Sequence, residues 1–326
     1  MKLIINIGKR YHVSFDTVKE FEETITSDKI NSITTVQTHR YIYKASYLFW
    51  QKMKKHYSTM KLVTIFNTLY SKTRKTEPNY FCILMGPNWE KCFPYFMLSG
   101  KKSIYLFDAW PTQHKNILRF ANSMNLDHVF VSSSQSALAL QSIAPKPVFT
   151  WIPEAINPAL YRYYDYKNKD IDVLALGRKF DIYHNKIVNG LKNNQRSYLY
   201  EEIKGIIVFP TREEFILGLA RTKISICFPS SITHPERSEN IETMTVRYLQ
   251  SMASKCLILG QAPKEMINLF GYNPVIEINM DDPVKQLDYL LDHFEDCIPL
   301  IEKNYSTVIE QHTWQKRWEK IHEIIK

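Results

Sequence analysis

Glu242, Arg247 and Gln250 belong to one stretch, ETMTVRYLQSMASKCLIL at residues 242–259, whose pattern predicts an amphipathic helix that runs into a buried strand. Packing alone requires none of Glu242, Arg247 and Gln250. Glu242 and Gln250 are about 12 Å apart along a helix that rises 1.5 Å per residue, so they do not bind the same small group. Arg247 shares a helix face with Gln250. A ligand that meets all three is long, with hydroxyl groups at both ends and negative charge along it.

A nucleotide-diphosphate sugar has this shape. It carries a sugar at one end, a ribose at the other, and a pyrophosphate that favours cationic side chains and helix N-termini. The structural alternative is that Glu242 caps the helix or lies exposed on its first turn, while Arg247 and Gln250 lie on a solvated face. These residues alone leave both interpretations open.

The stretch resembles the donor-binding signature of the GT-B glycosyltransferases, especially the retaining family-4-like group and its spore-maturation-protein-like relatives. Their pattern is a glutamate, seven residues, a second glutamate, and a run of small residues ending in glycine before a buried strand. Here Glu242 matches the first glutamate and Gln250 the second, with Lys255 at the glycine position. Arg247 matches the arginine of a variant in the relatives. The resemblance implies that Glu242 contacts the donor sugar, Gln250 the ribose, and Arg247 the donor or its neighbours.

Two further segments carry the same resemblance. WIPEAINPALY, residues 151–161, is similar to the segment that closes the family's first domain, and IDVLALGRKFDIYHNKI, residues 171–187, to the segment that opens its donor domain. The resemblance implies that Arg178 and Lys186 face the donor phosphates, with Lys179 a competitor for that role. Gly177 supports this role, because a strand-to-helix turn lets backbone N–H groups approach an anion. Two surface cations after a strand are the structural alternative.

The closing segment HTWQKRWEKI, residues 312–321, is similar to the family's last helix, which crosses back to brace the N-terminal domain. The resemblance covers roughly residues 150–326. It implies two Rossmann-like α/β domains of the GT-B fold, each a doubly wound parallel sheet, facing a cleft. We expect domains at 1–157 for the acceptor, 158–310 for the donor, and a helix at 311–326 that packs on the first domain.

The apolar runs of the chain predict the same α/β class. In the first half, KLIINIG predicts a strand and VSFDTVKEFEETIT a helix that buries Val18, Phe21 and Ile25. Fully apolar strands of this kind are typical of parallel sheets covered on both faces. The further strands that we expect are residues 80–86, 101–108, 126–133 and 146–153, then 171–177, 205–209, 224–228, 255–260 and 274–278, with helices between most of them and at the end of the chain.

Asp108 is the most suggestive residue of the first half. It ends the strand SIYLFD, so its carboxylate is expected at the carboxyl edge of a parallel sheet, where this fold class binds ligands. Trp110 follows and could stack on a sugar ring, while His114 and Trp89 are weaker candidates of the same kind. An aspartate that begins a turn before proline explains Asp108 equally well. We take Asp108 with Glu242 as the catalytic candidates and name no base.

The charge of the chain is uneven. Residues 1–165 hold 21 Lys and Arg against 11 Asp and Glu, and residues 29–76 have ten basic residues and no acidic one. Within them, the basic aromatic region, residues 39–75, has three interpretations: a packed helix with snorkelling lysines, a surface for an anionic membrane that carries a lipid-linked acceptor, or a nucleic-acid surface. Nothing here resembles a nucleic-acid-binding module, so we expect no nucleic-acid partner.

Other features limit the class of protein. No stretch reaches 18 consecutive apolar residues and no signal peptide is evident, so we expect a cytoplasmic protein, with peripheral attachment to the inner membrane face as an option. The five cysteines are widely spaced and predict buried, reduced thiols. No zinc motif exists, and DID at 170–172 begins a strand, so we expect neither a metal nor a cofactor.

These observations together predict a glycosyltransferase of the hexosyltransferase type. It would transfer a sugar from a nucleotide-diphosphate sugar, with a UDP-sugar as the first candidate, to a glycan or lipid-linked acceptor in surface polysaccharide or glycoconjugate biosynthesis. The resemblance alone implies that the anomeric configuration is retained. Two alternatives stay open: a catalytically degenerate binding or scaffold subunit, which Gln250 and Lys255 motivate, and a nucleotide-sugar epimerase of the same fold.

Overall fold

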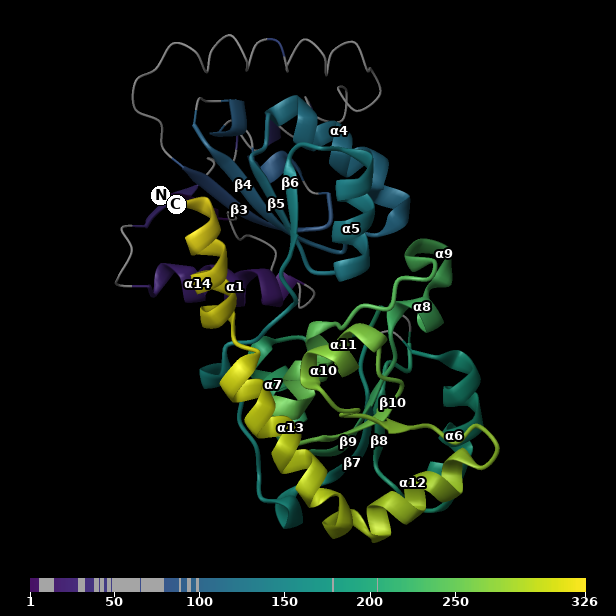
Figure 1. Ribbon diagram of the computed structural model, residues 1–326. Helices are drawn as coiled ribbons and strands as arrows, with labels where there is room; N and C mark the ends of the chain where they lie inside the picture. The colour runs from purple at the N-terminus through teal and green to yellow at the C-terminus, as the bar shows by residue number, and fades with distance from the viewer. Residues whose placement is uncertain are drawn as a thin grey trace. The chain divides into compact units, whose positions relative to one another are not determined.

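A computed structural model gives the structure of the protein (Figure 1). It describes residues 1–5, 15–28, 33–37, 41, 44–45, 48, 65, 79–87, 89–92, 95–97, 100–177, 179–203 and 205–326. The basic aromatic region at 39–75 therefore lies almost wholly outside the described residues, and so does Arg178.

The chain forms two compact units. The first unit comprises Met1–Pro153 and Arg317–Lys326, and the second unit comprises Glu154–Lys316. The chain thus passes between the units twice, at 153/154 and at 316/317. The boundaries expected from the sequence were 157/158 and 310/311. Each unit is an α/β domain built on one parallel sheet, as predicted.

The sheet of the first unit has six parallel strands in the order β2-β1-β3-β4-β5-β6. The strands other than β2 are mostly apolar runs, as expected of a buried parallel sheet, and the core beneath them includes Ile4, Leu84, Leu106 and Val131. The edge strand β2 is polar, mostly exposed and was not predicted. The bounds are β1 Lys2–Ile5, β2 Thr34–Gln37, β3 Tyr80–Met85, β4 Lys102–Phe107, β5 His128–Val131 and β6 Val148–Trp151.

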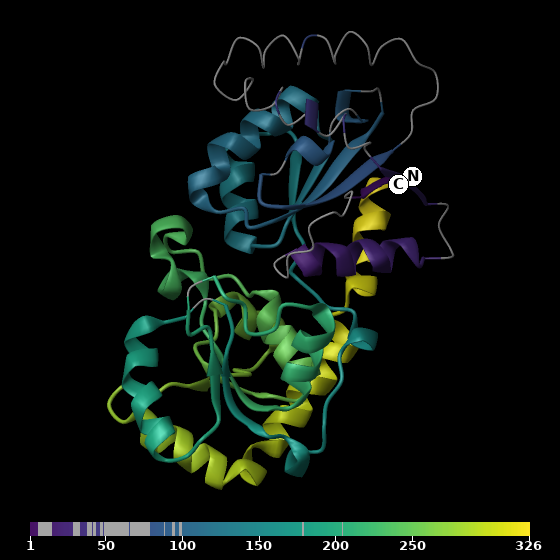
Figure 2. The same ribbon diagram turned by 180° about the vertical axis from the view of Figure 1, so that it is seen from behind.

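Helices cover this sheet. Val18, Phe21 and Ile25 of the first helix are buried, as its spacing predicted. The last helix lies beside the first in both views (Figures 1 and 2), where Trp318 Nε1 donates to Asp28 and its ring meets Phe81 at 5.5 Å. The bounds are α1 Asp16–Thr26, η2 Trp89–Cys92, η3 Tyr95–Met97, η4 Pro111–Gln113, α4 His114–Met124, α5 Ser134–Ile143 and α14 Trp314–Ile325.

The sheet of the second unit has five parallel strands in the order β11-β10-β9-β7-β8. Their bounds are β7 Ile171–Ala175, β8 Tyr198–Tyr200, β9 Thr222–Cys227, β10 Leu257–Gly260 and β11 Ile276–Glu277. The helices and turns are η5 Pro158–Leu160, η6 Tyr166–Asn168, α6 Asp181–Asn193, α7 Arg212–Ala220, α8 Ser230–Thr233, α9 Pro235–Ser238, α10 Val246–Ala253, α11 Lys264–Phe270, α12 Pro283–Asp292, η7 Phe294–Cys297 and α13 Ile298–Gln311.

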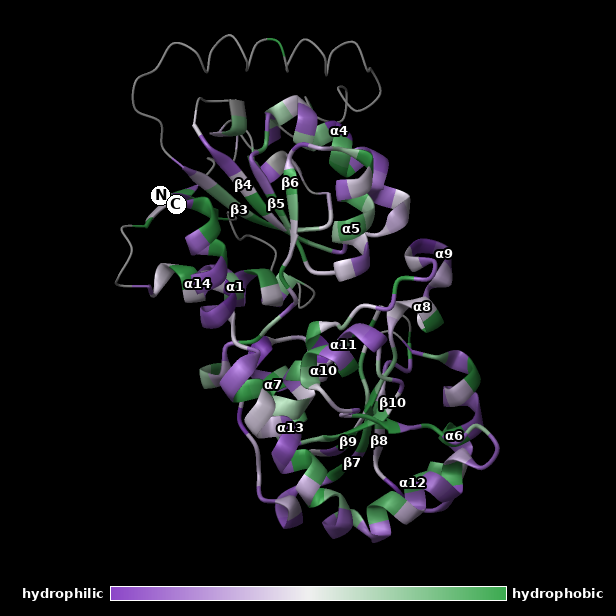
Figure 3. Ribbon diagram, viewed as in Figure 1, coloured by the Kyte–Doolittle hydropathy of each residue, from purple (hydrophilic) through white to green (hydrophobic). Residues whose placement is uncertain are grey.

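Successive strand residues of the second unit enter two different cores. Leu174 and Ile258 pack with α10 and α11, whereas Val173 and Leu257 pack with α6 and α12. Both faces of the sheet are therefore apolar. Figure 3 shows the strands of this unit mostly in green, whereas green and purple residues alternate along its helices. This is the doubly wound arrangement that the sequence predicted.

Two expectations about this unit are wrong. Residues 205–209 form no strand: Ile206 is exposed in a loop, and the strand that pairs with β7 is β8 instead. The helix of the stretch 242–259 begins only at Val246, so Glu242 lies in the preceding loop and the 12 Å estimate along a helix does not apply. An apolar run predicts burial in general, but pairing with a neighbour decides which run becomes a strand.

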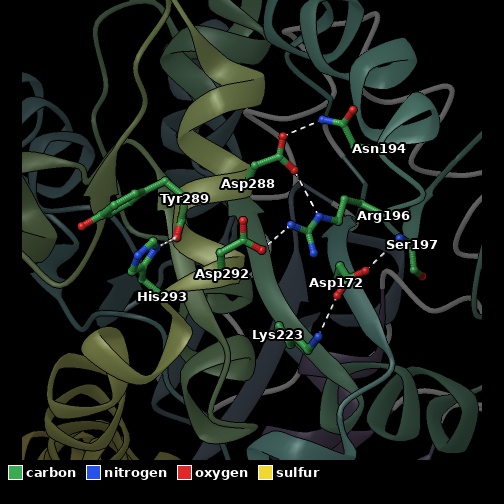
Figure 4. A network of polar contacts seen from close by, with 9 residues as sticks. All are labelled: Asp172, Asn194, Arg196, Ser197, Lys223, Asp288, Tyr289, Asp292 and His293. Carbon is green, nitrogen blue, oxygen red and sulfur yellow. Dashed lines mark hydrogen bonds and ion pairs between the residues drawn. The ribbon is translucent and has the colours of Figure 1, made fainter.

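Ion pairs connect the strands and α12 at the amino-terminal edge of the second sheet. Figure 4 shows Arg196 between Asp288 and Asp292 of α12, with Asp172 bonded to the Ser197 amide and to Lys223. Nearby, Asp170 pairs with Arg221. Both aspartates of the DID motif therefore serve the fold.

All five cysteines are buried thiols without a disulfide, as predicted. Among the described residues, none of the helices combines the length and hydrophobicity that crossing a bilayer requires.

Candidate functional site

The order of strands in the second unit places a topological switch between β7 and β9. From β7 the chain winds first toward β8 and then returns to β9, so the loops that leave β7 and β9 diverge at the carboxyl edge of the sheet. In open α/β sheets this is where ligands bind. The loop after β7 contains Gly177, and β9 ends at Cys227.

Arg247 reaches this switch point from the first turn of α10. A Cβ atom added to Gly177 would lie 2.4 Å from Nη2 of Arg247, which shows how closely the guanidinium approaches the Gly177 backbone. Gly177 has φ +68°, a conformation that glycine adopts without a steric cost. The structure therefore brings together two of the predicted site residues, Gly177 and Arg247.

Arg247 is partly buried and has no hydrogen bond or ion pair within the part of the chain that the structure describes. Burial lowers the pKa of its guanidinium, against the opposing effect of the Cys227 thiol and the Tyr248 hydroxyl. A guanidinium nevertheless stays charged. The switch point thus holds a desolvated positive charge to which the described residues offer no counter-ion, which is the arrangement expected of an anion-binding residue.

Glu242 lies at the same edge of the sheet, in the loop that precedes α10. One of its carboxylate oxygens accepts from the backbone N–H of Lys264, the first residue of α11, at 3.4 Å. It lies neither on α10 nor in the position of an N-cap, so both helix-based interpretations of Glu242 are wrong. The contact with α11 holds its carboxylate.

Gln250 lies within α10 and is 7% exposed. Its amide Nε2 donates to the hydroxyl of Tyr161 at 3.0 Å. A side-chain amide has a nitrogen that donates and an oxygen that accepts. Because the nitrogen of Gln250 is bonded to Tyr161, its carbonyl oxygen is the atom that can accept a further hydrogen bond. The solvated helix face that the structural alternative assumed is therefore wrong for Gln250.

Lys186 is bonded to the segment that follows β11. It projects from the exposed face of α6, and its ammonium donates to the carbonyl oxygen of Met280 at 2.7 Å. Lys179, the competing residue, lies over the ring of Tyr200 at 5.3 Å and reaches the Glu201 carbonyl at 3.5 Å. Neither contact involves a carboxylate.

The sequence of the second unit matches a known family model. Residues 199–323 match the model described as glycosyl transferase-like. No curated protein matches the chain.

Solved structures extend this likeness to both units. Anabaena HepE with UDP and glucose has a TM-score of 0.57 at 10% identity, over 99% of this chain and 98% of that one. A glycosyltransferase from Rickettsia africae has a TM-score of 0.54 at 11% identity, over 100% and 97%. The chain has the GT-B fold. The resemblance to GT-B glycosyltransferases that the sequence indicated is thereby confirmed.

TarM, also a GT-B protein, is similar over part of its length. Its TM-score is 0.53 at 13% identity, over 81% of this chain, and this chain spans 58% of TarM. A mutant of TarM from S. aureus has been solved with UDP, fondaparinux and α-GlcNAc-glycerol.

Lys255, the residue at the signature's glycine position, is accommodated in this GT-B chain. It has φ +51°, the left-handed conformation for which glycine is preferred. Its ammonium pairs with Glu302 at 2.8 Å and lies over the rings of Tyr163 and Tyr305. The side chain is thus held against α13, and its charge is neutralised there.

The first GT-B unit carries the acceptor-side candidates. Asp108 follows β4 at the carboxyl edge in the left-handed conformation, φ +51°, which aspartate tolerates better than most residues. His114 Nε2 lies 3.2 Å from the carbonyl oxygen of Ala109. Trp110 is buried, and Trp89 stacks on Phe120 within the core, so the two expected sugar platforms are not exposed.

The polar segment between β9 and α10 contains two short helices. Ser230 and Ser231 belong to the short helix α8, and His234 separates it from α9. No cluster of three or more potential metal-ligating side chains is present where the structure describes the chain.

Two buried carboxylates near the site escaped the sequence analysis. Glu154, 7% exposed, accepts from the Val246 amide at the start of α10, and Glu265, 6% exposed, accepts from the Thr243 hydroxyl and the Met244 amide. The sequence offers one indication that these two glutamates are buried. Each lies within two residues of a proline and among apolar residues, where burial is expected.

Proposed function

We propose that the protein is a glycosyltransferase that moves a sugar from a UDP-sugar to a glycan or lipid-linked acceptor. The observation that carries this proposal is Arg247, a desolvated cation at the switch point of a doubly wound sheet, without a counter-ion among the described residues. A diphosphate supplies the missing charge. UDP is favoured because HepE and S. aureus TarM, which share the fold, have been solved with it.

The other residues of the second unit take the roles that the resemblance to GT-B glycosyltransferases implies. Gly177 leaves room for the guanidinium and, with its backbone, for the phosphates. Glu242 orients the sugar, and the carbonyl oxygen of Gln250 accepts from a ribose hydroxyl. Lys186, together with Arg178, contributes positive charge toward the diphosphate, although Lys186 must exchange its bond to Met280 to touch it.

Retention of anomeric configuration is part of the proposal through the resemblance to the retaining group alone. The guanidinium of Arg247 would stabilise the departing diphosphate, a role that requires no metal. Asp108 acts on the acceptor side. The surface that meets a lipid-linked acceptor is the basic aromatic region at residues 39–75, at the cytoplasmic face of a membrane, in the synthesis of a surface polysaccharide or glycoconjugate.

The test is a thermal-shift screen of the purified protein with UDP, GDP, CMP and their sugar conjugates, because a ligand that binds only the folded state raises its melting temperature. UDP and a UDP-sugar should raise it. Arg247→Met should weaken UDP binding by about 30-fold, the loss of one charge-assisted contact. Lys285→Met, an exposed cation on α12, is the matched control. A parent protein that no nucleotide stabilises contradicts the proposal.

Turnover separates a transferase from a scaffold, which the neutral Gln250 continues to motivate. Release of UDP from the bound UDP-sugar in the presence of a panel of glycan and lipid-linked acceptors should be measurable. Glu242→Gln should reduce the rate by about 100-fold with an unchanged melting temperature. UDP binding without any release would assign the protein to the scaffold class.

A further inference from the structure

The segment that carries Glu242 and Arg247 is short, and residues from other parts of the chain hold its backbone. We call residues 242–247 the strap. Its backbone N–H groups at Met244 and Val246 donate to carboxylates from two other segments, Glu265 of α11 at 3.2 Å and Glu154 at 2.6 Å. Both carboxylates are buried, so water does not replace them freely.

The helix start explains why an external carboxylate is needed. Thr245 is the N-cap of α10 but makes no side-chain capping bond, and the Thr243 hydroxyl donates to Glu265 instead, at 2.8 Å. The first amides of a helix have no partner within it. Glu154 satisfies the Val246 amide and places a negative charge at the positive end of the helix dipole.

The contacts between the strap and α11 run in both directions. The Lys264 amide donates to Glu242, while the neighbouring Glu265 accepts from Thr243 and Met244. Loss of Glu265 therefore removes the bonds beside Glu242, and loss of Glu154 removes the bond beside Arg247.

We propose that Glu154 and Glu265 are positioning residues that preset the strap, so that Arg247 and Glu242 are in place before a donor binds. The effect on donor binding rests on the function proposed above. The effect on the conformation of the strap is independent of that function. Preorganisation of this kind lowers the ordering cost of binding, and a displacement of about 1 Å can cost up to 100-fold in rate.

The first measurement is hydrogen exchange of the Met244 and Val246 amides in the parent and in single variants. Glu265→Ala should increase exchange at Met244, and Glu154→Ala at Val246, each by about tenfold or more. Glu154→Gln and Glu265→Gln keep an oxygen acceptor and should protect both amides as the parent does. Unchanged exchange in the alanine variants overturns the proposal, whether or not the protein binds UDP.

The second measurement is calorimetric titration with UDP well below the melting temperature. Each alanine variant should bind about tenfold more weakly with an unchanged number of sites, and each glutamine variant within about threefold of the parent. A purely structural role instead lowers the number of sites and leaves Kd unchanged, which contradicts positioning. If an alanine variant does not fold, Glu154→Asp and Glu265→Asp, which withdraw the carboxylate by one methylene, take its place. A parent that binds no UDP contradicts the proposed function alone, because amide exchange still decides the strap.

Discussion

The cations at the two edges of the second sheet differ in whether they have partners within the protein. At the amino-terminal edge, Arg196 lies between two aspartates of α12, Lys223 pairs with Asp172, and Lys169 donates to three carbonyl oxygens. At the carboxyl edge, Arg247 has no such partner among the described residues.

The difference separates charges that hold the fold from a charge kept for a ligand. A partly buried cation costs free energy unless it is compensated, so its retention at the switch point indicates a function at the expense of stability. Replacing an arginine should therefore lower the free energy of unfolding at the amino-terminal edge and raise it at the carboxyl edge.

The largest effect is expected at Lys169, which is 3% exposed. Its ammonium donates to the carbonyl oxygens of Ala220, Thr222 and Ser254, so Lys169→Met leaves three buried acceptors without this donor. The free energy of unfolding should fall by about 3 kcal/mol, measured by urea denaturation. Lys285→Met should leave it unchanged, and a fall of equal size there would remove the contrast between buried and exposed lysines.

The sharpest contrast comes from one substitution made at both edges. Arg196→Met breaks the contacts to Asp288 and Asp292 and should lower the free energy of unfolding by about 1 kcal/mol. Arg247→Met removes an uncompensated charge and should raise it by about 1 kcal/mol in the absence of ligand. Thermal unfolding without nucleotide is the measurement. A loss of stability in both variants would mean that Arg247 also serves the fold.

A smaller effect is expected from Asp172→Asn. The amide keeps an acceptor for the Ser197 N–H, now 2.9 Å from the carboxylate, but loses the charge that faces Lys223. The loss should be about 0.5 kcal/mol and should shrink in high salt. Denaturation at two ionic strengths tests this, since a loss independent of salt would point to packing instead.

The smallest effect is a pH dependence. Burial lowers the pKa of His184 below its ordinary value of 6.5, and the ring nitrogen Nδ1 lies 2.8 Å from the Tyr198 hydroxyl. Below pH 6.5 the imidazole of the unfolded chain binds a proton more readily than that of the folded chain. The free energy of unfolding is therefore not reduced by His184 above pH 6.5, and it declines as the pH falls below this value. His184→Gln should reduce this decline in melting temperature. An identical slope would assign the dependence to other histidines.

Local pattern was sufficient for most of the fold. Apolar runs located most strands of both parallel sheets because a sheet covered on two faces needs apolar residues at consecutive positions. The edge strands β2 and β8, which are short and less buried, were not predicted. Pattern failed at residues 205–209, since hydrophobicity does not specify a pairing partner. It also failed at the start of α10: Val246 begins the helix because Glu154, which stands 92 residues earlier, accepts from its amide.

The candidate site was predicted less completely for the same reason. Residue types within one stretch named Glu242, Arg247 and Gln250. The approach of Arg247 to Gly177, the bond between Gln250 and Tyr161, and the lack of a counter-ion for Arg247 among the described residues are tertiary facts. No local pattern contains them.

The lysine at the signature's glycine position limits what a substitution to glycine can achieve. Lys255 in a left-handed conformation is tolerable when Glu302 and the two tyrosines receive its side chain. Lys255→Gly would relieve the cost of the left-handed conformation but would also remove the ion pair with Glu302 and the contacts with the two tyrosine rings. The two effects oppose each other, so a glycine at this position should change the free energy of unfolding less than either effect alone.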